Sequence, residues 1–168
     1  MTTDADLLAA RAKRLAVPIV EDTASDGHSA IVVEIDAQRY AFPLADVRRA
    51  LVLGPLTELP HVPPIVLGLG TADGDVLAVF DGRVWAGGSR RPSADRTPVL
   101  ILGPAPTPLA LAVDRFVGSL TLPASTATAG WLQQVTEEGI LIVRVGALLE
   151  DPAFSVSEGT VDDHHQED

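Results

Sequence analysis

The chain has 168 residues, of which 46% are hydrophobic and only 4% aromatic, and it contains no cysteine. This composition suits one domain with an aliphatic core, and it excludes disulfides, thiolate zinc sites and cysteine nucleophiles. The formal net charge of −11 argues against nucleic acid and anionic lipid as direct partners. No apolar run approaches the roughly 20 residues of a membrane span, so we expect a cytoplasmic protein with no direct membrane insertion.

The two ends of the chain are predicted to lie outside the folded domain. Residues 1–28 are expected to form a short helix over residues 4–16, whose N-terminus an early aspartate can cap, and then a polar linker. Residues 153–168 are expected to be a disordered acidic tail, because the segment 156–168 holds five acids and no base. The domain itself is then predicted to span residues 29–152.

Within this domain the hydrophobic pattern is that of short strands. Apolar runs predict strands at residues 31–35, 40–44, 46–53, 76–80, 99–102, 109–113, 114–122 and 140–145. Tight turns are expected at residues 36–39, 72–75 and 137–139. The longer connections are rich in Gly and Pro, with a Pro-rich loop at 54–64 and an exposed Gly/Arg/Ser loop at 86–96.

The strand pattern contains an internal repeat. Residues 40–51 (YAFPLADVRRAL) resemble residues 109–120 (LALAVDRFVGSL) at a constant offset of 69. Residues 71–82 likewise resemble residues 136–146, and both stretches contain a turn in which an acid precedes Gly. Short strands at this spacing, with little helix, are typical of β-barrels. The sequence therefore predicts an all-β domain of two small barrels that arose by internal duplication.

The stretch Asp73-Gly74-Asp75 admits three interpretations: a calcium loop, a pair of catalytic carboxylates, or a hairpin turn. A calcium loop needs six or more oxygen ligands spread over about a dozen residues, but an apolar run follows Asp75. Asp-Gly is among the best dipeptides for a tight hairpin turn, because Gly readily takes a positive φ. We therefore expect a turn here, and we expect Asp81 and Glu58, the other acids considered for catalysis, to be solvated.

Nothing else in the sequence predicts an active site. His61 is the one histidine inside the predicted domain, and it lies in the Pro-rich loop. No phosphate-binding glycine motif is present. The basic stretch SRRPSADR (89–96) has no interleaved aromatic residues and is expected to be a solvated loop, with partner docking as the alternative. We therefore predict no catalytic residue, no cofactor and no metal site, which favours a binding module.

Several segments, in the same order, resemble the CheW-like domain family. YAFPLADVRRA (40–50) stands in register with the family's Y-G-I-x-I-x-x-V-x-E-I stretch. LPHVPPIVLGLGTADGDVLAVFDG (59–82) is similar to the following loop and hairpin, I-P-x-x-P-x-x-x-G-V-I-N-L-R-G-x-x-x-P-V-I-D-L. LALAVDRFVGSL (109–120) resembles G-L-V-V-D-x-V-x-x-V, and EEGILIVRVGALL (137–149) resembles the closing segment. The resemblance extends over roughly residues 29–150.

This resemblance implies two five-stranded, SH3-like barrels and a non-enzymatic adaptor role in a chemosensory two-component pathway. The implied partners are a CheA-type histidine kinase and methyl-accepting chemoreceptors, which would place the protein at the inner face of the membrane through receptor arrays. We expect partner contacts at Leu44, Val47 and Arg48 in the first half, and at Asp73 and Gly74 at the tip of the hairpin.

The chain departs from the family pattern at this tip. Where the family has N-L-R-G, the sequence has Thr71-Ala72-Asp73-Gly74, so that an acid replaces an Arg associated with coupling between receptor and kinase. Two alternatives therefore stay open. One is a divergent CheW-like module that binds a different partner or its own copies outside the usual receptor array. The other is a small hydrolase that uses Asp73 and Asp81.

Overall fold

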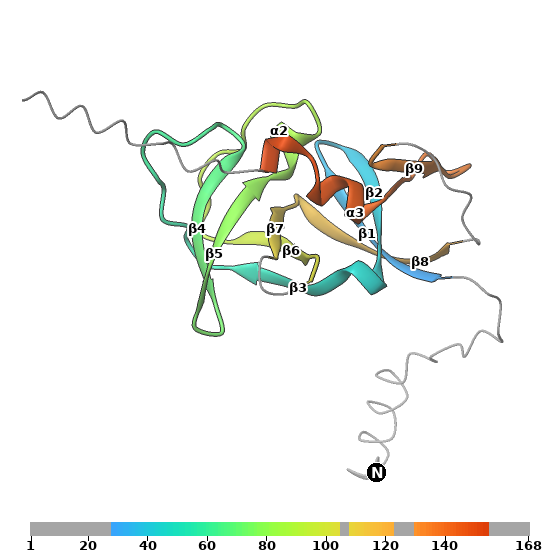
Figure 1. Ribbon diagram of the computed structural model, residues 1–168, viewed down its shortest axis with the longest axis horizontal. Coiled ribbons are helices and arrows are strands. Elements are labelled where there is room, and N and C mark those ends of the chain that lie inside the picture. The colour runs from blue at the N-terminus through green and yellow to red at the C-terminus, as the bar shows by residue number, and fades with distance from the viewer. Residues whose placement is uncertain (1–27, 105–107, 123–129, 155–168) are drawn as a thin grey trace, which may run out of the picture.

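The computed structural model describes residues 28–104, 108–122 and 130–154 (Figure 1). The predicted N-terminal helix, the linker up to residue 27 and nearly all of the predicted acidic tail lie outside the described residues. Within the described residues, ten strands form two five-stranded sheets. No helix in this part of the chain is long and apolar enough to cross a membrane.

Sheet 1 has the strand order β8-β1-β2-β10-β9. Its strands are β1 (His28–Ile35), β2 (Gln38–Pro43), β8 (Arg115–Leu122), β9 (Leu132–Val135) and β10 (Leu141–Val143). Sheet 2 has the order β3-β6-β7-β5-β4. Its strands are β3 (Val47–Leu53), β4 (Val66–Ala72), β5 (Asp75–Asp81), β6 (Thr97–Leu102) and β7 (Leu109–Ala112). The predicted all-β architecture is confirmed, whereas closure of each sheet into an SH3-like barrel stays a prediction.

The two sheets exchange strands between the halves of the sequence. The first half places β1 and β2 in sheet 1 and then crosses to sheet 2 with β3, β4 and β5. The second half starts in sheet 2 with β6 and β7 and then crosses to sheet 1 with β8, β9 and β10. Each sheet contains one parallel pair, β2 with β10 and β5 with β7, while the other pairs are antiparallel. Neither sheet is therefore built from one half alone.

Strand alternation sorts side chains by size. Tyr40 and Phe42 of β2, with Leu109 and Leu111 of β7, belong to a core cluster formed by residues of both sheets. Ala41, between Tyr40 and Phe42, belongs to a second cluster, formed by residues of sheet 1. Ala110, between Leu109 and Leu111, belongs to a third cluster, formed by residues of sheet 2. Because successive side chains of a strand point to opposite faces, the large residues join the two sheets and the alanines let each sheet curl over its own small core.

Four short helical segments were not predicted from the sequence. They are η1 (Leu44–Asp46), α2 (Gly82–Trp85), α3 (Val145–Leu149) and η2 (Pro152–Phe154). Leu44 and Val145 were assigned to strands, which was wrong. Helix α2 begins at residue 82 because the side chain of Asp81 accepts a hydrogen bond from the backbone N–H of Arg83 and so caps it. Helices this short do not produce a periodic apolar pattern, so hydrophobic periodicity could not have found them.

Candidate functional site

The predicted contact residues lie along one edge of sheet 2. Leu44 begins η1, at the crossing from sheet 1 to sheet 2, and Val47 is the first residue of β3. Strand β3 is an edge strand that pairs only with β6. In Figure 1 β3 runs along the lower side of the domain, and the turn that joins β4 to β5 projects downward past it. The structure thus places Leu44, Val47 and Arg48 in chain order along this edge.

These three residues differ in what they can offer a partner. Leu44 is 46% exposed, so its apolar side chain is available at the surface. Arg48 is also exposed, and it lies where the register between β3 and β6 is irregular, between Val47 and Arg49. Val47 is only half-exposed and packs against the main core. Leu44 and Arg48 are therefore placed for direct contact, while Val47 holds the start of β3 against the domain.

Asp73 and Gly74 form the predicted turn between β4 and β5. Ala72 pairs with Asp75 across the hairpin, and the two residues between them have positive φ angles of 51° and 89°. Two consecutive positive φ angles characterise a type I′ turn. The interpretation of Asp73-Gly74 as a hairpin turn is confirmed. No atom lies within 4 Å of the place where a Cβ on Gly74 would stand, so the tip is open to a partner.

An ion pair that the sequence analysis missed ties this tip to β3. Arg49 pairs with Asp73, and both side chains are about half exposed or more, at 51% and 65%. Strands β3 and β4 are the opposite edges of sheet 2, so the pair crosses the gap between them. Only the fold brings residues 49 and 73 together. The acidic charge at the tip is therefore accompanied by a neighbouring positive charge.

A cavity of about 240 Å³ opens beside this ion pair. It is lined by Arg48, Arg49, Ala72, Asp75, Leu77, Ile101 and Pro108. At the other end of the same gap, Thr57 and Leu69 exchange two backbone hydrogen bonds of 2.8 Å. The gap between β3 and β4 is thus closed by backbone at one end and by exposed charged side chains at the other. The lining combines charged and apolar residues, a composition that suits docking of a protein segment.

Two residues that were expected to be solvated, Asp81 and Arg91, are buried or nearly buried. Asp81, expected to be solvated, is fully buried, and Arg91, expected in a solvated loop, has a side chain only 10% exposed. The Asp81 carboxylate accepts hydrogen bonds from the backbone N–H groups of Arg83 (2.9 Å) and Arg91 (2.8 Å) and from Arg91 Nε (3.1 Å). A buried carboxylate requires such partners. Burial of charged groups depends on tertiary contacts, so local sequence carried no signal for it.

Asp114 extends this cluster to the other sheet. Its Oδ1 accepts hydrogen bonds from Arg83 Nε (2.8 Å) and Arg91 (3.2 Å), and its Oδ2 accepts one from the backbone N–H of Asp36 (2.8 Å). Burial alone would raise the pKa of Asp114, but the hydrogen bonds from Arg83 and from the Asp36 amide outweigh it and lower that pKa below its usual value. The cluster of Asp81, Arg83, Arg91 and Asp114 therefore fastens the end of sheet 2 to the β1–β2 turn of sheet 1.

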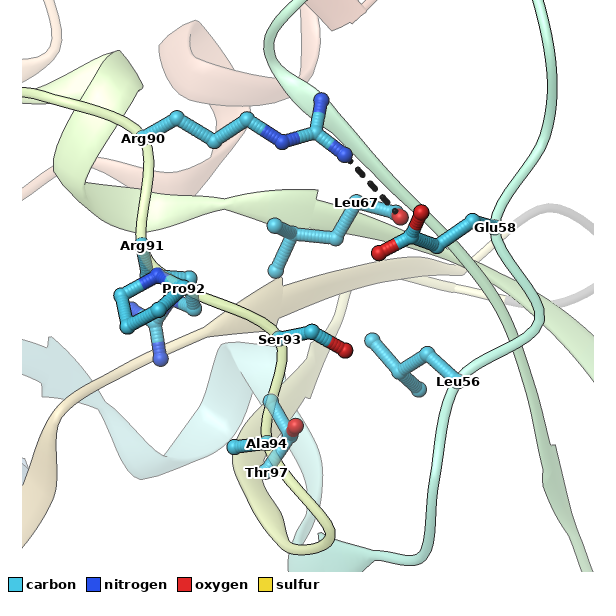
Figure 2. Close-up of a pocket in the computed structure, with 9 residues that line it drawn as sticks. All are labelled: Leu56, Glu58, Leu67, Arg90, Arg91, Pro92, Ser93, Ala94 and Thr97. Atoms are coloured by element: carbon cyan, nitrogen blue, oxygen red, sulfur yellow. Dashed lines mark hydrogen bonds between the residues drawn. The ribbon is translucent and has the colours of Figure 1, made fainter.

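The loop that carries Arg91 also closes a small cavity of about 60 Å³, shown in Figure 2. Arg90 lies across it and donates hydrogen bonds to the carbonyl oxygens of Pro64, Val66 and Leu67. This volume holds about two water molecules, and the guanidinium is already bonded to backbone. The cavity lies between two loops, and its volume is too small for an organic cofactor.

The remaining candidates are dispersed. Asp73 and Asp81 lie at the two ends of β5, about 20 Å or more apart at the rise of an extended strand. Carboxylate pairs of glycosidases are roughly 5–10 Å apart, so these two acids cannot cooperate and the hydrolase alternative is wrong in this respect. His61 is exposed in its loop. Among the described residues, no group of three His, Asp or Glu side chains is placed to hold a metal ion.

The family model of the CheW-like domain matches residues 29–152. The chain belongs to this family. The predicted resemblance is confirmed, and the CheW-like region contains every predicted contact residue as well as the buried ion cluster.

One solved structure that resembles this CheW-like chain is that of the scaffolding protein TtCheW from Thermoanaerobacter tengcongensis. The TM-score is 0.58 and the identity 16%, with 70% of this chain and 89% of that chain covered. At this identity the likeness shows the fold alone. No match was found among the curated proteins.

Proposed function

We propose that the protein is a non-enzymatic adaptor in a chemosensory two-component pathway, where it couples a CheA-type histidine kinase to methyl-accepting chemoreceptors. The observation that carries this proposal is the CheW-like match over residues 29–152. An adaptor of this kind works in the cytoplasm, at the inner face of the membrane where receptor arrays gather.

The surface proposed for partner contact is the edge formed by η1, β3 and the β4–β5 tip. Leu44 supplies apolar area, and Arg48 supplies a charge at the rim of the cavity of about 240 Å³. Asp73 and Gly74 present a turn whose backbone is open to a partner. Burial of a few anchoring side chains gives most of the affinity at such interfaces, while rim charges adjust association rate and partner choice.

The test is direct binding of the purified protein to a CheA-type kinase and to receptor cytoplasmic fragments, measured by calorimetry. Leu44→Asp should weaken binding to at least one of these partners by roughly tenfold or more, because a charge replaces a buried anchor. The matched control is Val135→Asp, which changes a residue 51% exposed on β9, at the far edge of sheet 1. Equal affinities for the wild type and Leu44→Asp would remove this edge from the interface.

A second candidate function is a CheW-like module that binds a different partner or its own copies. The observation that favours it is the acid at the tip, Asp73, where the family resemblance implies an Arg. Asp73 also forms an ion pair with Arg49 of the chain itself. Asp73→Arg should then weaken binding to the native partner and improve binding to an ordinary CheA-type kinase. Sedimentation of the protein alone measures self-association. A wild type that binds neither kinase nor receptor would favour this second function.

A further inference from the structure

Two charges at the proposed contact edge are exchanged relative to the family pattern. In the register of YAFPLADVRRA (40–50), Arg49 stands where the stretch Y-G-I-x-I-x-x-V-x-E-I has its Glu. At the hairpin tip, Asp73 stands where N-L-R-G has its Arg. The fold brings these two positions together, because Arg49 and Asp73 form an ion pair across the gap between β3 and β4. The two departures are therefore one exchange of charges within a single pair.

The order of the charges in this pair matters little to the stability of the domain. The side chains of Arg49 and Asp73 are 51% and 65% exposed. Exposed ion pairs contribute little to stability, because water screens them and ordering two side chains costs entropy. An acid at position 49 and a base at position 73 would serve the fold equally well. The order does matter to a protein that covers the pair, since like charges brought together at an interface exclude a wrong partner.

Two neighbouring side chains extend the same charge order. Arg48 is the extra residue of β3 where the register with β6 shifts between Val47 and Arg49. Successive side chains of a regular strand point to opposite faces, but an irregularity of this kind redirects them, and both arginines line the cavity of about 240 Å³. Asp75, the first residue of β5, lines it as well. Among the described residues, neither Arg48 nor Asp75 forms an ion pair.

The edge thus carries two positive charges on β3 and two negative charges at the hairpin tip, with one of each not neutralised within the described chain. The rest of the cavity lining is apolar and consists of Ala72, Leu77, Ile101 and Pro108. Val76, next to the tip, is 67% exposed. This surface is complementary to a protein segment that carries an acid, an apolar residue and a base.

We propose that this edge selects a partner whose charges are inverted relative to those that suit the family pattern. The partner presents an acidic side chain to Arg48 and Arg49 and a basic side chain to Asp73 and Asp75, with an apolar residue over the cavity. A partner complementary to the Glu and Arg of the family pattern would meet like charges at both positions. The inference rests on the proposed adaptor function and specifies the chemistry of the kinase or receptor surface that binds here.

The test is the double exchange Arg49→Glu with Asp73→Arg, which keeps the ion pair and the net charge and reverses only the order of the charges. Calorimetry compares two sets of partners. One set is the CheA-type kinase and receptor fragments of the same organism, and the other is a kinase and receptor whose own adaptor carries Glu and Arg at these positions. The double exchange should weaken binding to the first set roughly tenfold and strengthen binding to the second by a similar factor. Asp73→Arg alone should gain less with the second set, because it leaves Arg49 beside a like charge.

The matched control exchanges another surface ion pair, that of Glu34 and Arg115 between β1 and β8 of sheet 1. The double variant Glu34→Arg with Arg115→Glu should leave the affinities for both sets of partners unchanged. It also keeps the net charge, so a change specific to Arg49 and Asp73 reports the local order of charges. If the double exchange at Arg49 and Asp73 binds both sets as the wild type does, the proposed selection is wrong.

Chemical denaturation of the single and double variants decides separately whether the pair forms in solution. Arg49→Glu and Asp73→Arg should each lower the midpoint of unfolding slightly, and the double exchange should recover most of that loss. Losses that simply add would overturn the inference and leave the adaptor function standing. A wild type that binds neither set of partners would overturn the adaptor function, and the selection with it.

Discussion

Replacing Arg91 with methionine should destabilise the domain strongly, although Arg91 lies in a surface loop. Its side chain is 10% exposed and bonds two carboxylates, those of Asp81 and Asp114, and two backbone carbonyls. Methionine fills similar volume without the charge. Asp81, which is fully buried, would then keep only the two backbone N–H donors of residues 83 and 91.

Loss of one partner from a buried ion pair costs about 3–5 kcal/mol. Because two backbone N–H groups still donate hydrogen bonds to Asp81, we expect a loss near the lower end of this range, about 3 kcal/mol in the free energy of unfolding. For a domain of this size, that corresponds to a fall in Tm of roughly 10–15 °C. The control Arg96→Met changes an exposed residue of the same loop, and it should stay within about 0.5 kcal/mol of the wild type.

The assay is chemical denaturation followed by the fluorescence of Trp85 and Trp131, whose rings contact each other with centroids 4.8 Å apart. A second substitution tests the cause. Asp81→Asn should destabilise the wild type, yet it should recover about 1 kcal/mol in the Arg91→Met background, because it removes the uncompensated buried charge. An Asp81→Asn effect of the same sign and size in both backgrounds would refute the reasoning from charge pairing.

Three further predictions concern other parts of the fold. Asp114, whose pKa is lowered in the folded state, stabilises the domain above its unfolded pKa of about 3.9. This stability is lost as pH falls through the folded pKa, so Asp114→Asn should flatten the acid limb of a stability–pH curve, and an unchanged limb would contradict this. Gly68→Ala should lower the free energy of unfolding by more than Gly74→Ala does. For Gly74→Ala we expect a loss of about 1 kcal/mol, from its positive φ alone. A Cβ at residue 68 would in addition collide with the carbonyl of Thr57, whereas residue 74 has open space around it. Thermal melts of the two variants give the comparison. Arg49→Ala should lower stability by less than about 1 kcal/mol, since the Arg49–Asp73 pair is exposed; a larger loss in the same melts would show that this pair holds the gap between β3 and β4 closed.

Much of the local structure could be predicted from the sequence. The Asp73-Gly74 turn follows from the preference of Asp-Gly for positive φ angles, a property of the backbone that needs no tertiary context. The apolar run Tyr40-Ala41-Phe42, which follows a turn signal, was enough to place a strand there, and all three residues are buried. The repeat at an offset of 69 residues predicted an internal duplication, and the motifs along residues 40–149 identified the family.

Only the tertiary structure decided how these strands combine and which charges are buried. No local pattern shows that β3 crosses to sheet 2 and β8 to sheet 1, since a strand's own sequence records its faces and not its neighbours. The same limit applies to Asp81, because nothing in its local sequence distinguishes it from a solvated acid. It becomes buried because Arg91, ten residues away, folds over it and donates hydrogen bonds to its carboxylate. The Arg49–Asp73 pair likewise depends on the curling of sheet 2, which brings its two edge strands together. Burial and long-range pairing are properties of the assembled chain, and they decide the charge of the candidate surface.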